Sequence, residues 1–246
     1  MQEYGFSHVW QQGDFVTHAT IALLLGMSVL SWTVIVIKTG NLWRMRRLTR
    51  HAEQAFWQAG DFSSGLQCLG DARDNPFLSL ALAGQDAAEH HRDSLPRLQD
   101  RMGISDWITR CLKNSVDESV ARMQGGLAIL ASIGSTAPFI GLFGTVWGIY
   151  HALLAIGASG QTSIGHVAGP VGEALIMTAL GLFVAIPAVL GYNALTRGNR
   201  AVLAKLNRFA HGLHAFFVTG ASVHAPHFNS GASLSAVPQP GTGAGQ

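Results

Sequence analysis

The stretch EALIMTALGLFVAIPAVLGYNALT (residues 173–196) opens with one acid, Glu173, and contains no other Asp, Glu, Lys or Arg. The preceding residues 123–172 contain none of these four residue types at all. A run of about 20 apolar helical residues spans the hydrocarbon core of a bilayer. Because an ionisable group at the head of such a run is costly, Glu173 is by default a candidate functional residue.

Further apolar blocks lie outward from this stretch, at residues 15–37 and 125–156. Charged residues make up 12% of the chain, against about 25% in ordinary soluble domains, yet residues 39–122 have a normal charge density. The first block is not typical of a signal peptide, because residues 1–14 hold two acids and no Lys or Arg. The pattern predicts an all-α polytopic membrane protein with three transmembrane helices, two of them extended into the cytoplasm, plus a small helical cytoplasmic segment.

The basic residues predict the orientation. All 16 Lys and Arg residues lie within 38–122 and 197–208, and such residues stay cytoplasmic near membrane ends. We therefore expect a periplasmic N-terminus (1–14), transmembrane helices at 15–38, 126–156 and 169–196, a cytoplasmic helical segment (39–125), a periplasmic loop (157–168), a cytoplasmic helical extension (197–221) and a disordered tail (222–246). The basic cluster that follows the first span has a topogenic role, with contact to anionic lipid headgroups as an alternative. The net charge of +2 does not indicate nucleic-acid binding.

An apolar stripe follows the third span. Its residues recur at steps of three and four and predict that the helix continues into the cytoplasm and packs against another helix: Val202, Leu206, Phe209, Leu213 and Phe216. Within the cytoplasmic segment we expect helices at 42–60, 76–92 and 104–125. Its two thiols, Cys68 and Cys111, match no metal or redox spacing and are predicted to be buried structural residues.

Small residues recur through the second span at three- and four-residue steps, which lets membrane helices approach closely. They include Gly134, Gly141, Gly144 and Gly148. At 1.5 Å per residue the block 125–156 is longer than the bilayer core, so we expect one helix that projects into the cytoplasm and bends at Pro138.

Polar side chains are sparse in the second and third spans. Thr145 is the one hydroxyl within 137–146, and Thr178 is the one polar side chain between Glu173 and Tyr192. Either threonine alone is explained equally well by a bond to its own i−4 carbonyl. Together with Glu173 they predict a narrow path for a proton, although Glu173 and Thr178 lie about 140° apart around an ideal helix.

Several motifs in these spans carry a resemblance. The run GLFGTVWGI (141–149), preceded by APF (137–139), is similar to the signature of the MotA/TolQ/ExbB family of proton-channel stator subunits. The third span resembles the family's as well, in EAL (173–175), TALGL (178–182), AIPAV (185–189) and YN (192–193). One departure is Ala168-Gly169-Pro170, where the family usually reads Ala-Pro-Gly.

The resemblance implies a homopentamer in the bacterial inner membrane around a pore that holds single-span partner helices of the ExbD or TolR type. The partner's membrane Asp is then the proton carrier, and Thr145, Thr178 and Glu173 correspond to residues of the surrounding wall. We assign the chain to the ExbB branch, which energises outer-membrane import of siderophores and other nutrients through a TonB-type transducer. The alternative is the TolQ branch of the Tol-Pal envelope-maintenance system.

Two further hypotheses belong to other classes. A structural scaffold without an ion path would use the same residues for packing alone. An intramembrane protease would use Ser159 with His151 or His166, but a Gly/Ser-rich turn explains residues 157–160 better. No nucleotide, metal or cofactor motif is present in the sequence, so we expect no enzymatic activity, metal or cofactor.

Overall fold

The computed structural model describes residues 14–70, 75–94, 103–159 and 164–220 of the chain. Within these ranges all the regular elements are helices, so the predicted all-α class is confirmed. The predicted N-terminal segment (1–13 of it) and tail (222–246) lie outside the described residues. The helices are α2 (Phe15–Gln58), α3 (Phe62–Leu69), α4 (Pro76–Ser94), α5 (Ile104–Gln124), α6 (Leu127–Ser159) and α7 (Ile164–Thr219).

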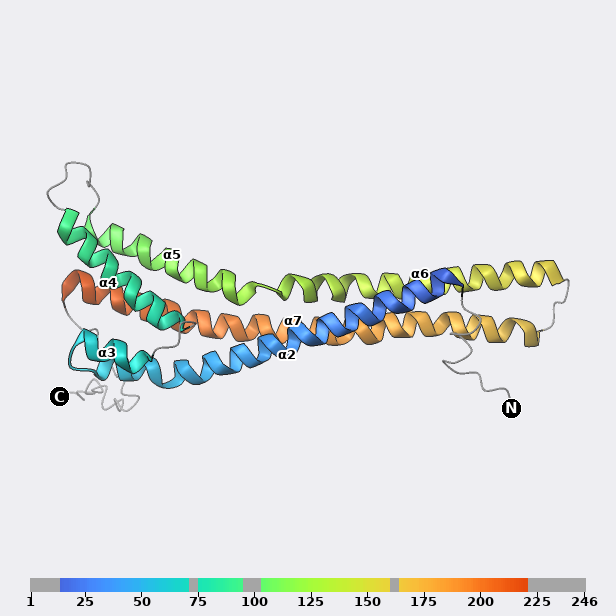
Figure 1. The fold of residues 1–246 in the computed structure, drawn as a ribbon, viewed down its shortest axis with the longest axis horizontal. Helices are drawn as coiled ribbons and strands as arrows, with labels where there is room; N and C mark the ends of the chain where they lie inside the picture. Colours follow the sequence, from blue (N-terminus) through green and yellow to red (C-terminus); the bar gives the residue numbers. More distant parts are fainter. Residues whose placement is uncertain (1–13, 71–74, 95–102, 160–163, 221–246) are drawn as a thin grey trace, which may run out of the picture.

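The membrane region consists of three long helices. Figure 1 shows α6 running beside α7, while the first part of α2 crosses both of them. The three segments long and apolar enough to cross a membrane are Phe15–Arg47, Ile104–Leu154 and Ala174–Thr219. The predicted three transmembrane helices are therefore present, and each segment covers all or nearly all of one of the apolar blocks.

The first helix is longer than its apolar block. Helix α2 is continuous from Phe15 to Gln58, so the span and the predicted cytoplasmic helix at 42–60 form one element of 44 residues. Its N-terminus is capped by the Asp14 carboxylate, which accepts a hydrogen bond from the backbone N–H of Phe15. This helix thus continues without a break from the first apolar block into the following segment that is predicted to be cytoplasmic.

The second span is one helix and is separate from the helix that precedes it. Helix α5 ends at Gln124, Gly126 has a φ of +81°, and α6 begins at Leu127. A positive φ is accessible to glycine at little cost, so the Gly125-Gly126 pair allows the break. Helix α6 has 33 residues and, at about 1.5 Å per residue, is longer than the bilayer core, as expected for the block 125–156, while α5 matches the separate helix expected at 104–125. Projection of α6 into the cytoplasm remains a prediction. The chain remains helical through Pro138, which lies inside α6.

The main apolar core lies at the end of the bundle that holds α3, α4 and α5, here called the head region and predicted from the sequence to be cytoplasmic. The ends of α2 and α7 pack there against α3, α4 and α5, at the left of Figure 1. The Phe209 ring lies 5.0 Å from that of Phe56 and 5.3 Å from that of Phe77, centroid to centroid. The predicted stripe on α7 is confirmed, since four of its members are fully buried and Phe216 is half-buried: Val202, Leu206, Phe209 and Leu213.

The two thiols occupy different environments. Cys111 is half-buried on α5, and burial raises the pKa of its thiol. Cys68 is exposed, so its predicted burial is wrong. The reason is that α3 is short and amphipathic: it turns Gly65 and Leu69 toward the core and leaves Cys68 on its outer face.

Candidate functional site between α6 and α7

Two glycines bring the backbones of α6 and α7 into contact. A Cβ atom added to Gly141 would lie 2.6 Å from the Met177 carbonyl oxygen, and one added to Gly181 would lie 2.7 Å from the Ala137 carbonyl oxygen. Neither site accepts a side chain without movement of a backbone. The small residues of the second span are therefore used for close helix packing, as their spacing predicts.

This close approach places two hydroxyls together one turn along the helices. Thr145 on α6 is 7% exposed and Thr178 on α7 is half-buried. Their Oγ1 atoms are 2.5 Å apart. The Thr145 hydroxyl also lies within bonding distance of the carbonyl oxygens of Gly141, at 3.1 Å, and Ala174, at 3.2 Å. The structure thus joins two of the predicted site residues in one hydrogen-bonded unit.

The unit has two donor arrangements, because each hydroxyl has one hydrogen and two lone pairs. In the first, Thr145 donates to a backbone carbonyl and Thr178 donates to Thr145. In the second, Thr145 donates to Thr178, and the Thr178 hydrogen remains available to another acceptor. The bond of Thr145 to its own i−4 carbonyl does occur, but the contacts to α7 extend beyond it.

The third predicted residue is placed only by its backbone. Glu173 lies in α7, five positions before Thr178, and its side chain is outside the part of the chain that the structure describes. The neighbouring residue Ala174 is buried and contributes its carbonyl to the hydroxyl pair. Whether Glu173 joins this site remains a prediction.

Other candidate residues have local partners. The His151 imidazole lies 3.1 Å from the Trp147 carbonyl oxygen and packs on the Trp147 ring, while His214 lies 3.1 Å from the Ser105 hydroxyl. Among the described residues, no group of three or more His, Cys, Asp or Glu is positioned to hold a metal ion. The side chains of Ser159 and His166 are outside the description.

Two features near the contact between α6 and α7 were not predicted from the sequence. The first is Gly181 of α7, which lies opposite Gly141 of α6. Its place in the TALGL motif did not by itself indicate that it contacts α6. The second feature is a pair of side chains that cap α5. Lys38 Nζ donates to the Arg122 carbonyl at 3.1 Å, and Asn199 Nδ2 donates to the Met123 carbonyl at 3.0 Å. No local pattern in the sequence indicates contacts over such separations.

The hydroxyl pair lies within the region that a known family covers. The model of the MotA/TolQ/ExbB proton channel family matches residues 79–208, which include α5, α6 and most of α7. The chain belongs to this family. The predicted resemblance is thereby confirmed, and with it the assignment to a class of proton channels.

Relatives in this family favour one branch. A biopolymer transport protein ExbB from Xanthomonas campestris is 42% identical over 91% of this chain and 92% of its own length. An ExbB from Neisseria meningitidis is also 42% identical, over 84% of this chain and 94% of its own. The Tol-Pal system protein TolQ of Haemophilus influenzae is 29% identical over 92% of this chain and 99% of its own. The chain is therefore more similar to these ExbB proteins than to this TolQ, in agreement with the predicted branch.

Proposed function

We propose that the chain forms the wall of a motor in the bacterial inner membrane that is driven by the proton motive force. With a single-span partner of the ExbD type it energises a TonB-type transducer for outer-membrane import of siderophores and other nutrients. The 42% identity to proteins named ExbB, over most of the chain, supports this proposal. In this role the chain itself carries no enzymatic activity and needs no cofactor.

The proposed arrangement is a homopentamer with its N-terminus in the periplasm and its C-terminus in the cytoplasm. The distribution of Lys and Arg supports the orientation, because the described basic residues, such as Lys38 and Arg122, lie toward the end of the bundle that holds α3, α4 and α5. The domain divisions follow from it, with residues 39–125 and 197–221 on the cytoplasmic side. Broad apolar exposure on the described bundle, as at Phe139 and Phe183, supports contact with lipid and with neighbouring copies.

The hydroxyl pair is the proposed part of the proton path. Because the pair has two donor arrangements, Thr178 can form a hydrogen bond with a carboxyl group of the partner whether that group is protonated or ionised. A protonated carboxyl donates to the Thr178 oxygen when Thr178 donates to Thr145. An ionised carboxylate accepts from Thr178 when Thr145 donates to Thr178. The pair therefore offers a hydrogen bond to both forms without moving a heavy atom.

The driving force is sufficient for small steps between packed helices. One charge that crosses 100 mV supplies about 2.3 kcal/mol, which biases one of several near-equivalent contacts between the partner and the wall. Glu173, at the head of the apolar part of α7, is proposed to exchange protons with water near that end of the path. Contact with the side chain of Thr178 is not required for this role.

The proposal is tested by substitutions that distinguish the hydroxyl of Thr178 from the volume of its side chain. Thr178→Val keeps the volume and removes the hydroxyl, whereas Thr178→Ser keeps the hydroxyl. In cells that depend on a ferric siderophore, we expect the valine variant to lose growth and the serine variant to retain it, with equal amounts of assembled complex. Normal growth of the valine variant would support a scaffold instead. Normal siderophore import in cells that lack the chain, together with an envelope defect, would support the TolQ-type alternative.

A further inference from the structure

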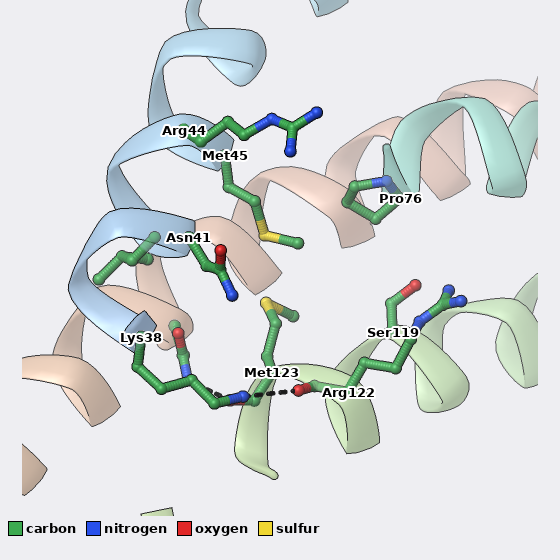
Figure 2. A pocket seen from close by; sticks show the side chains of 10 residues that line it. Lys38, Asn41, Arg44, Met45, Pro76, Ser119, Arg122 and Met123 are labelled. Atoms are coloured by element: carbon green, nitrogen blue, oxygen red, sulfur yellow. Dashed lines mark hydrogen bonds between the residues drawn. The ribbon is translucent and has the colours of Figure 1, made fainter. Parts of the chain in front are cut away.

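A basic cavity lies where the head region meets the membrane region. Its volume is about 200 Å³. Figure 2 shows side chains of α2 and α5 on opposite sides of it. The lining residues are Lys38, Asn41, Leu42, Arg44, Met45, Pro76, Ser119, Arg122, Met123 and Asn199.

The charge of this cavity has one sign. Three of its lining residues are cations, Lys38, Arg44 and Arg122, and none of those described carries a carboxylate. Arg122 contacts Glu118 at 3.5 Å, but that acid is highly exposed and lies outside the lining. An ion pair in such a setting is weak, so the Arg122 guanidinium can also bind an anion. Two Asn amides, on Asn41 and Asn199, add hydrogen-bonding groups beside the cations.

The depth of the cavity corresponds to the headgroup level of a bilayer. Lys38 directly follows the apolar block that ends at Ile37, and α6 begins just past the cavity, at Leu127. Trp43, one position before Arg44, is exposed and carries the Arg47 guanidinium 3.6 Å from its ring centroid. Exposed Trp with neighbouring basic residues is typical of a membrane interface.

We propose that this cavity binds a phosphate group, and that the group belongs to an anionic phospholipid of the cytoplasmic leaflet. The guanidinium groups of Arg44 and Arg122 donate to the phosphate oxygens from two sides, and Lys38 supplies a third positive charge. Since Lys38 also donates to the last turn of α5, the bound headgroup lies against the joint between α5 and α6. The lipid thereby stabilises the angle at which the head region meets the membrane.

The test is retention of lipid by the purified chain, measured by native mass spectrometry in detergent with equal phosphatidylglycerol and phosphatidylcholine. The pocket variant is Arg44→Gln with Arg122→Gln, which leaves the structural Lys38 bond in place. The control is Arg47→Gln with Arg110→Gln, which removes the same charge from the same two helices outside the cavity.

We expect the native chain to retain phosphatidylglycerol selectively and the pocket variant to retain it roughly 25-fold less, the factor for two basic residues at an anionic headgroup. The control should keep its selectivity. Equal retention of both lipids, or equal loss in both variants, would overturn the proposal. Displacement of phosphatidylglycerol by millimolar inorganic phosphate would overturn the lipid source and indicate a soluble phosphate compound. Retention despite phosphate supports the lipid.

Discussion

The head region and the membrane region of this protein share helices α2 and α7 but are held together in opposite ways. Around Phe209 in the head region, large rings are fully buried and meet edge to face. In the membrane region the contact is made by Gly141 and Gly181, whose Cα atoms are close enough that no Cβ fits. Many large side chains there point outward, and Phe183 is 69% exposed.

The difference follows from the solvent. In water, burial of apolar area stabilises the core, so large side chains lie inside. In lipid that gain is absent, and close packing of small residues with hydrogen bonds between helices replaces it. Polar groups at the contact between α6 and α7 are then few, and they lie where they can form hydrogen bonds. The hydroxyl pair of Thr145 and Thr178 lies directly beside the glycine contact for this reason.

The largest expected effect is in the apolar core of the head region. Phe209→Ala should lower the free energy of unfolding of that region by about 3–5 kcal/mol, because it removes a buried ring and leaves a cavity among Phe56 and Phe77. Guanidinium titration followed by tryptophan fluorescence measures it. Val218→Ala, at a more exposed position of the same helix, is the control. A loss below about 1 kcal/mol would mean that the rings are not the main stabilising contact.

A smaller but more specific effect on stability is expected at the contact between α6 and α7. Gly181→Ala should destabilise the packing of α6 against α7 by about 1–3 kcal/mol, since the new methyl group meets a carbonyl oxygen of α6. The thermal midpoint of the complex in detergent measures the change. Gly26→Ala is the matched control, because nothing lies within 4 Å of its added Cβ. An unchanged midpoint for Gly181→Ala would contradict the close approach.

The junction between the two regions should respond more weakly. Asn199→Ala removes the hydrogen bond to the Met123 carbonyl, which is worth about 0.5–1.5 kcal/mol. We expect faster amide hydrogen exchange in the last turn of α5, with little change in the core. Asn193→Ala, at an exposed position of α7, should leave exchange unaltered. Equal exchange in both variants would show that Asn199 does not hold this turn.

The smallest effect concerns the two thiols of the head region, Cys68 and Cys111. Burial raises the pKa of Cys111 and also restricts access, so near neutral pH its thiolate fraction is lower than that of an unperturbed thiol. Maleimide should therefore modify Cys68 first. The lag of Cys111 should shrink as the pH rises toward its pKa, which single-cysteine variants can measure. Faster modification of Cys111 would contradict the packing of α5.

Much of this comparison could be predicted from sequence because both regions carry strong patterns. Apolar length identified the spans, and the stripe that includes Leu206 and Phe209 identified the buried face of α7. The division between α5 and α6 agrees with the helix expected at 104–125 and the span expected at 126–156, whereas the positive φ of Gly126 was not predicted. The Lys38 bond joins residues 84 apart in the chain, which no local rule anticipates.

For the candidate site, the useful signal was the small number of polar side chains in the second and third spans. Thr145 and Thr178 stood out as isolated hydroxyls, and their partnership follows from the register that the glycines impose. The sequence did not indicate that Ala174 contributes a carbonyl, because every residue has one.

Proton uptake by the reconstituted complex tests the central claim most directly. The chain and its single-span partner are placed in vesicles, a membrane potential is imposed, and the internal pH is followed with a trapped dye. The account predicts that the double variant Thr145→Val with Thr178→Val loses potential-driven uptake, while Thr145→Ser with Thr178→Ser keeps it. Undiminished uptake by the valine variant would show that protons do not depend on these hydroxyls.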